Sequence, residues 1–358
     1  MVAIPVIHVG CTNFAHGRLQ ALVNCDGLYP AACVDIDLDA AREGIKSLDG
    51  DVPDGLADRI YPSITEASQN HKAQACLIYA STTAHVELVV ESLGLGLHTL
   101  CVKPIVTDQS EFREIMEAHK RNPKLVLVQG QNKRWNPAAA KMREWLFEEN
   151  GIGEMLGGEC RFWIRQNLHT GPHSRQPDAF VEGLFFHAGT SHQLDQLVAA
   201  KGTPKYVMAR AHRRVDYELG QTGVWGTAGG QALLEYENGA CISYTGTRAS
   251  HARTPFGWSG SWTFHGTNGD IRRDSGHLQL FREGECIEDL ELQDLHPGLI
   301  EDDRIQFDAF AQAISTGKDR YWIQETSLGT WLTMEACNAS ARGHERIDLD
   351  ELRSSLID

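Results

Sequence analysis

One lysine stands where an apolar run ends, and its place could serve proton chemistry. The stretch LHTLCVKPIVTD opens with apolar residues and then presents Lys103-Pro104. At the rim of a sheet this ammonium group could contact a bound ligand. The plainer alternative is a solvated lysine at a strand end, followed by a turn.

The stretch VGCTNFAHG, at the end of the first apolar run, is a candidate for a dinucleotide-binding turn. A dinucleotide-binding turn reads Gly-x-Gly-x-x-Gly, and the corresponding positions here hold Gly10, Thr12 and Ala15. Gly10 permits a tight turn, and Ala15 permits close packing of a helix on a strand. The amides around Asn13 and Phe14 would face a pyrophosphate at a helix N-terminus, and the Thr12 hydroxyl could bond a phosphate. Because only the first position is glycine, an ordinary strand–helix turn stays equally open.

A carboxylate at the end of the second apolar run suits ribose recognition. Asp35 comes about 25 residues after Gly10, where it would accept hydrogen bonds from the adenosine ribose hydroxyls. A 2'-phosphate would meet two negative charges, because Asp37 follows and the next basic residue is Arg42. We therefore expect NAD rather than NADP. Asp37 also suits the N-cap of a helix.

These residues must be positioned by alternating strands and helices. Apolar runs such as VAIPVIHVG, YPAACVDID and KLVLVQGQ alternate with helical patterns such as FAHGRLQALVNC over the first ~125 residues, which predicts a doubly wound parallel sheet. Later runs become longer and alternating, and Asn238-Gly239 joins two of them in the strongest short hairpin signal. We expect an α/β chain whose second part is α+β with an open, mostly antiparallel sheet.

Composition excludes several classes of protein. The 358 residues indicate two domains, and 33 basic against 48 acidic residues argue against a nucleic-acid partner. The nine cysteines form no Cys-x-x-Cys and predict buried thiols in a reducing compartment. With neither a signal peptide nor an apolar stretch of membrane length, we expect a soluble cytoplasmic protein without a membrane partner.

The order and spacing of the motifs resemble the glucose-fructose oxidoreductase, inositol dehydrogenase and MocA family (Gfo/Idh/MocA). The resemblance covers nearly the whole chain and includes VGCTNFAHGRLQAL, YASTTAHVEL, LHTLCVKP, NKRWNP, SHQLDQL and WTFHGTNGDI. It implies an NAD-binding Rossmann domain over residues 1–128 and a substrate-binding and oligomerisation domain over 129–358, with C-terminal helices that can pack back on the first. The open sheet of such proteins usually pairs, so a homodimer or homotetramer is implied.

The resemblance implies a role for Lys103 at the nicotinamide. The family pattern is Glu-Lys-Pro, and Val102 here replaces the glutamate. A lysine facing the cationic nicotinamide ring and partly buried would have a lowered pKa, which suits acid–base chemistry. It could also donate a hydrogen bond to a developing alkoxide.

Further cofactor contacts are implied at two other motifs. The family pattern Thr-Pro-x-x-x-His becomes Ala80-Ser81 through His85, without its proline. Ser81 and Thr82 could still line the cofactor, and His85 closes the pattern. Arg134 in NKRWNP matches a family arginine near the cofactor and the active site.

The stretch HAGTSHQLDQLVAA supplies the second catalytic candidate. The family signature is Asp-x-x-x-His-x-x-Asp, and His192 and Asp195 match its last two members on one helical face. Ala188 replaces the first aspartate. A His192 base suits neutral pH, with Asp195 orienting or binding the substrate.

His187 precedes this helix. Thr190 and Gln193 predict a capping box that starts the helix there, which leaves His187 in a loop. From this loop, the His187 side chain could take the place of the aspartate that Ala188 replaces. The alternative for both histidines is packing or surface exposure. Their spacing does not favour a metal site.

Two loops combine arginine, histidine and tryptophan and could border a sugar. Aromatic rings suit a C–H face and arginines suit hydroxyl or acid groups; solvated loop residues are the alternative. The candidates for substrate contact are Arg165, His169, Arg253 and Trp258.

These observations favour an NAD-dependent dehydrogenase acting on a CH–OH group of a sugar, polyol or related compound. Lys103 and His192 would carry the proton transfer. One alternative is a glycoside-cleaving enzyme that holds NAD, oxidises transiently and eliminates. The other is a non-catalytic dinucleotide-binding regulator, which the missing glycines, Val102 and Ala188 keep open.

Overall fold

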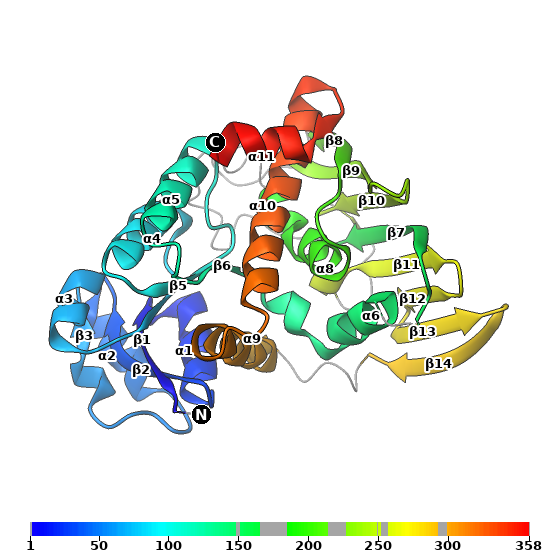
Figure 1. Ribbon diagram of the computed structural model, residues 1–358. Coiled ribbons are helices and arrows are strands. Elements are labelled where there is room, and N and C mark those ends of the chain that lie inside the picture. The colour runs from blue at the N-terminus through cyan, green and yellow to red at the C-terminus, as the bar shows by residue number, and fades with distance from the viewer. Residues whose placement is uncertain are drawn as a thin grey trace. The chain divides into compact units, whose positions relative to one another are not determined.

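The chain forms two units in this computed structural model, which describes residues 2–147, 151–164, 185–213, 227–248, 250–251, 257–292 and 299–357. The first unit comprises Met1–Trp135 and Gly298–Ser327, and the second comprises Asn136–Pro297 and Leu328–Asp358. Figure 1 shows the elements of both. The division of function at residue 128 stays a prediction.

A six-stranded parallel sheet forms the first unit, in the order β3-β2-β1-β4-β5-β6. This is the strand order of dinucleotide-binding folds. Parallel strands are covered on both faces and therefore read as continuous apolar runs, which is why the sequence revealed them. The strands are β1 (Ile4–Val9), β2 (Leu28–Val34), β3 (Ile60–Tyr61), β4 (Ala75–Ile78), β5 (His98–Val102) and β6 (Leu127–Gly130).

The helices of the first unit begin at side-chain caps in several cases. Asp37, Ser63 and Asp108 each accept a hydrogen bond from a backbone N–H of the first turn that follows. The helices are α1 (Asn13–Val23), α2 (Leu38–Lys46), α3 (Ile64–Asn70), α4 (His85–Gly94), α5 (Gln109–Arg121) and α9 (Leu299–Ser315), with short helices η1 (Leu56–Asp58), η2 (Thr82–Ala84) and η3 (Asn132–Trp135).

Helix α9 joins the core of the first unit although it lies late in the chain. Phe307, Phe310 and Ala311 are buried in the same apolar cluster as Leu19 and Leu22 of α1. The packing is close, because a Cβ on Gly27 would come 2.7 Å from the Cβ of Ala311.

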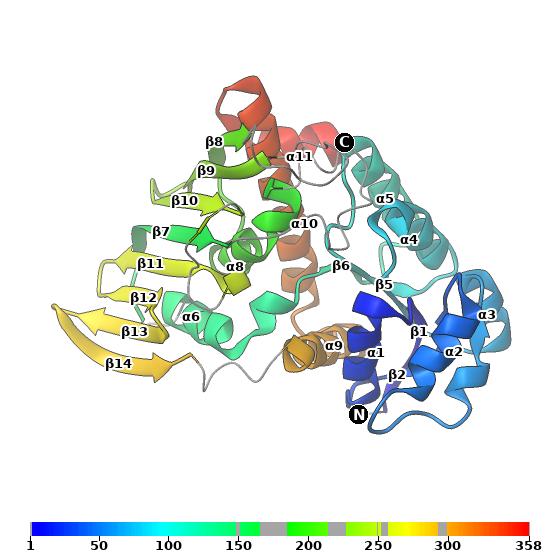
Figure 2. The same ribbon diagram turned by 180° about the vertical axis from the view of Figure 1, so that it is seen from behind.

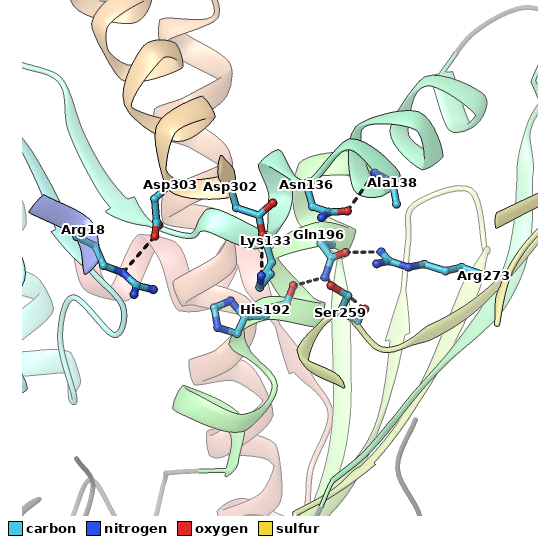
Figure 3. A network of polar contacts seen from close by, with 10 residues as sticks. All are labelled: Arg18, Lys133, Asn136, Ala138, His192, Gln196, Ser259, Arg273, Asp302 and Asp303. Atoms are coloured by element: carbon cyan, nitrogen blue, oxygen red, sulfur yellow. Dashed lines mark hydrogen bonds and ion pairs between the residues drawn. The ribbon is translucent and has the colours of Figure 1, made fainter. Parts of the chain in front are cut away.

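Ion pairs also hold α9 to the rest of the first unit. Lys133 Nζ lies 2.7 Å from Asp302 Oδ2, and Arg18 Nε lies 3.2 Å from Asp303 Oδ2 (Figure 3). Burial raises the pKa of Asp303 to about 6, although Arg18 and a hydrogen bond from Asn132 counteract it. The raised pKa shows that burial disfavours the charged form of this carboxylate even beside a guanidinium.

A nine-stranded sheet forms the second unit, in the order β14-β13-β12-β11-β7-β10-β9-β8-β15, which Figure 2 shows from behind. Among the described strands of this sheet, only β7 and β10 pair in parallel; the other pairs of the sheet are antiparallel. The strands are β7 (Met155–Trp163), β8 (Tyr206–Arg213), β9 (Thr227–Glu235), β10 (Cys241–Thr247), β11 (Ser261–Gly266), β12 (Asp270–Asp274), β13 (His277–Arg282), β14 (Glu285–Glu291) and β15 (Ile347–Asp348). The expected fold class is confirmed.

Hairpin signals in the sequence are confirmed in this sheet. Asn238-Gly239 turns β9 into β10, with Gly239 at φ +80° and its N–H donating to the Tyr236 carbonyl at 2.9 Å. The second unit's helical segments are α6 (Pro137–Phe147), α8 (Ser191–Lys201), α11 (Leu349–Ile357), a π-helical turn η5 (Phe185–Gly189) and η6 (Gly257–Ser259). Helix α10 (Arg320–Gly343) supplies residues to both units.

The prediction of buried thiols holds for most of the cysteines. All nine are free thiols, and six of them are buried. Burial raises the pKa of Cys76 to about 12, so this thiol stays protonated. None of the helices in the described ranges is both long and apolar enough to cross a membrane.

Replacing Lys133 by methionine should destabilise the fold, because it removes the ammonium group from the fully buried Asp302 carboxylate. We expect the free energy of unfolding to fall by about 3–5 kcal/mol. Lys46→Met is the control, since Lys46 pairs with Glu43 on the exposed surface at 2.8 Å; this pair should contribute about 0–1 kcal/mol. Urea unfolding followed by circular dichroism measures both, and equal losses would contradict the prediction.

Candidate active site

The carboxyl ends of the parallel strands bring the first group of candidates to one edge of the sheet. Gly10 follows β1, Asp35 follows β2, Ser81 follows β4 and Lys103 follows β5. Strand order reverses between β1 and β4, and such switch points are where open α/β sheets bind ligands.

The turn after β1 has no room for a side chain. Gly10 has φ +92°, and a Cβ there would come 2.7 Å from the Tyr79 carbonyl oxygen and 2.9 Å from the Ala15 Cβ. The Gly10 N–H donates to the Val34 carbonyl at 2.8 Å. The tight turn and the close helix–strand packing expected of Gly10 and Ala15 are therefore both present.

Helix α1 presents an N-terminus suited to an anion. Its N-cap, Thr12, makes no side-chain capping hydrogen bond, and the first turn contains no acidic residue. Asn13 has φ +50°, and the Arg18 guanidinium carbon lies 3.8 Å from the centre of the half-exposed Phe14 ring. The backbone N–H groups of a helix N-terminus and its positive dipole end favour phosphate.

Asp35 is tied to this turn by its carboxylate. Its Oδ2 accepts a hydrogen bond from the Cys11 N–H at 2.8 Å, and its Oδ1 accepts one from the Asp37 N–H at 3.1 Å. Each carboxylate oxygen has a further lone pair for a ribose hydroxyl. Asp37 is an N-cap, as the alternative interpretation had it, because its Oδ1 accepts from the Ala40 N–H at 3.0 Å.

The candidate residues after β4 and β5 differ in how much of each is exposed. Ser81 is exposed and Thr82 is half-buried at the start of η2, whereas His85 is fully buried. The His85 ring lies between two backbone carbonyls, so it offers no surface to a cofactor. Lys103 is half-buried after β5, and the Lys103–Pro104 peptide bond is cis.

Arg134 lies in the interior of the first unit. Its Nη1 donates to the Thr326 hydroxyl at 2.5 Å, and its guanidinium carbon lies 5.5 Å from the centre of the Trp322 ring. Only 4% of the residue is exposed. These contacts indicate that Arg134 positions the end of β6 against α10.

In the second unit, His192 and Trp258 lie together. Their rings meet edge to face with centroids 5.9 Å apart, and Trp258 also packs on Phe162 at 5.4 Å. Both side chains are partly exposed. An imidazole beside an indole suits a ligand with hydroxyl groups and an apolar C–H face.

Buried glutamines hold this pair in place; sequence reasoning missed Gln196 and assigned Gln193 to a capping box. Gln193 donates to the Trp258 carbonyl, and Gln196 donates to the His192 carbonyl at 2.8 Å. Gln196 Oε1 accepts from Arg273 Nη1 at 3.0 Å, as Figure 3 shows. Two glutamines three residues apart in SHQLDQL, each followed by a leucine, were the available signal.

The predicted capping box is wrong, although the helix starts where expected. Thr190 is the N-cap of α8, but its hydroxyl donates to the Phe186 carbonyl at 2.8 Å. Gln193 reaches Trp258 in place of the N-cap backbone. The π-helical turn that precedes α8 supplies the carbonyl that Thr190 uses.

His187 and Asp195 are both buried. His187 lies in the π-helical turn, not in a loop, and its Nε2 lies 3.4 Å from Glu335 Oε2. Asp195 is fully buried and accepts a hydrogen bond from the Thr330 hydroxyl at 2.9 Å. The contacts of both residues lead to α10, whereas His192 stays accessible.

The remaining substrate candidates, Arg165, His169 and Arg253, lie outside the described residues. Within the described ranges, histidine, cysteine, aspartate and glutamate form no group of three that could hold a metal ion.

Comparisons with protein families match both parts of the chain. Residues 4–130 match the model described as oxidoreductase family, NAD-binding Rossmann fold, and residues 139–272 match the GFO/IDH/MocA C-terminal domain. An inositol 2-dehydrogenase 3 from Saccharopolyspora erythraea is 25% identical over 55% of this chain and 52% of its own length. A myo-inositol 2-dehydrogenase from Thermotoga maritima is 25% identical over 76% of this chain and 75% of its own. The chain thus spans about half the length of some curated relatives.

Solved structures share the fold. An oxidoreductase from Agrobacterium radiobacter, in complex with NAD+, L-tartaric acid and magnesium, has a TM-score of 0.81 to this chain at 20% identity. The match covers 98% of this chain and 99% of that one.

Gly10→Ala should abolish dinucleotide binding, because the new Cβ would collide with the Tyr79 carbonyl at a φ that alanine avoids. Gly17→Ala, in the helix α1 that follows this turn, is the control, since nothing lies within 4 Å of a Cβ there. We expect Gly17→Ala to keep wild-type NAD affinity and to gain slightly in stability. Fluorescence titration with NADH and thermal unfolding measure the two effects. NADH binding by Gly10→Ala at wild-type affinity would contradict the proposed site.

Proposed function

Because the chain belongs to the Gfo/Idh/MocA family of oxidoreductases, we propose that it transfers a hydride between NAD and a hydroxyl of a sugar, polyol or related compound. The observation that carries the proposal is the edge where Gly10, Asp35 and Lys103 follow three strands of one parallel sheet, β1, β2 and β5. The tight turn at Gly10 and the helix N-terminus that follows it support a pyrophosphate site there.

Charge at the end of β2 favours NAD over NADP. Asp35 presents a carboxylate where the adenosine ribose would lie, and Asp37 adds a second one two residues later. Arg42 is engaged with Asp39 at 2.9 Å. A 2'-phosphate would therefore meet negative charge without a dedicated cation.

The chain's own residues then have separate tasks. NAD, when bound, supplies the hydride acceptor. Alcohol oxidation also releases a proton, and Lys103 and His192 are the proposed acceptors; the partial exposure of each side chain supports this assignment. Trp258 offers its ring to the C–H face of the substrate, and Asp195 holds α8 against α10.

The open sheet supports a homodimer or homotetramer. Strands β7, β8 and β9 leave large apolar side chains exposed, and Met208 and Leu233 are cross-strand neighbours. Exposed apolar residues that gather on one face of a sheet favour association. The side chains are Leu156, Met208 and Leu233.

Lys103→Ala and His192→Ala test the assignment. Each should lower kcat by about 10²–10⁴-fold, because proton transfer is lost, and should leave the Kd for NAD close to wild type. Lys46→Ala, on the exposed surface, is the control. NADH formation is followed by absorbance on a panel of inositols, sugars and glycosides.

Other outcomes separate the alternatives. Cleavage of a glycoside without net NADH would replace the dehydrogenase by the elimination mechanism. NAD binding without turnover of any compound in the panel would favour a regulator.

A further inference from the structure

The backbone beside Lys103 is held from two directions. On one side, His85 Nδ1 lies 2.8 Å from the Pro104 carbonyl oxygen. On the other, the Ile105 N–H donates to Gln129 Oε1 at 3.0 Å. Both contacts are buried, so water cannot substitute for either without opening the core.

The His85 ring also connects two strand ends. Its Nε2 lies 3.1 Å from the Ala80 carbonyl oxygen, just after β4, while its Nδ1 faces the residue after Lys103, just beyond β5. Strands β4 and β5 are neighbours in the sheet. The imidazole therefore lies between the carboxyl ends of these two strands.

Only one of the two contacts can be a hydrogen bond when the ring is neutral. Burial lowers the pKa of His85, and the carbonyls of Pro104 and Ala80 counteract part of this. A neutral imidazole has one N–H, and carbonyl oxygens only accept. The shorter contact, to Pro104, is where that N–H belongs.

We propose that His85 is a positioning residue for Lys103: it anchors the Pro104 carbonyl so that the adjoining ammonium group keeps one place at the sheet edge. The inference rests on the proposed role of Lys103. Small displacements of a reacting group lower rates strongly, which gives a buried anchor one residue away a direct effect on turnover.

The competing account is that His85 only stabilises the fold. It predicts that any substitution at position 85 lowers stability without affecting Lys103 in particular. The two ring nitrogens allow a sharper test, because the amide of asparagine can occupy the place of Nδ1, whereas that of glutamine reaches the place of Nε2.

His85→Asn and His85→Gln form the test pair in the full-length protein. His85→Asn can still donate to the Pro104 carbonyl and should lose about threefold in kcat; His85→Gln should lose about 100-fold, with the KM and Kd for NAD little changed. His119→Gln is the control, since His119 bonds the Leu125 carbonyl at 2.9 Å in the same unit. Circular dichroism and thermal unfolding confirm that each variant folds. Equal losses in the two His85 variants would overturn the proposal.

A second readout is independent of turnover. Reductive ¹³C-methylation gives each lysine an NMR resonance, and Lys103→Arg identifies the one from Lys103. This resonance should shift in His85→Gln and keep its position in His85→Asn and His119→Gln. A resonance that stays fixed in His85→Gln would overturn the proposal even if kcat fell. If the wild-type protein turns over nothing, the proposed function fails, and the resonance alone decides whether His85 positions Lys103.

Discussion

The exclusion of a side chain at Gly10 is the constraint on which the edge of the first sheet depends. The Tyr79 carbonyl and the Ala15 methyl group close in on this backbone, so β1, the end of β4 and helix α1 meet at one point. The Cys11 N–H then reaches Asp35, which links the end of β2 to the same turn. A cofactor site built this way is mostly backbone, and its charge comes from one helix terminus and one carboxylate.

Most of the fold could be predicted because its strands and turns correspond to sequence patterns that span only a few residues. The buried strands read as apolar runs, and Asn238-Gly239 marked its hairpin through the backbone conformation that glycine permits. The place of α9 had no such signal. Phe307 and Phe310 mark an apolar face, but nothing local shows that this face packs with α1, almost three hundred residues earlier.

The residues of the candidate site also differ in how far local sequence could predict them. Gly10 and Asp35 could be proposed from residue type and a short spacing, and the tight turn expected at Gly10 is present, whereas their cofactor roles stay predictions. Asp195 was correctly predicted to lie on a helix, whereas His187 was wrongly predicted to lie in a loop. The direction and burial of both side chains depend on α10, which the sequence leaves unplaced. Gln196 escaped notice and Gln193 was assigned to a capping box, because a glutamine in a helix ordinarily faces water and only its partners reveal that it is a core residue.

The discontinuous first unit has a consequence for synthesis. Its core includes α9, so a nascent chain that has emerged only as far as Trp135 still lacks Phe307 and Phe310. Residues 136–297 must leave the ribosome before the earlier segment can finish packing. The usual order, in which an amino-terminal domain matures first, is thereby blocked, and the apolar flank of α1 stays open to chaperones until α9 has emerged.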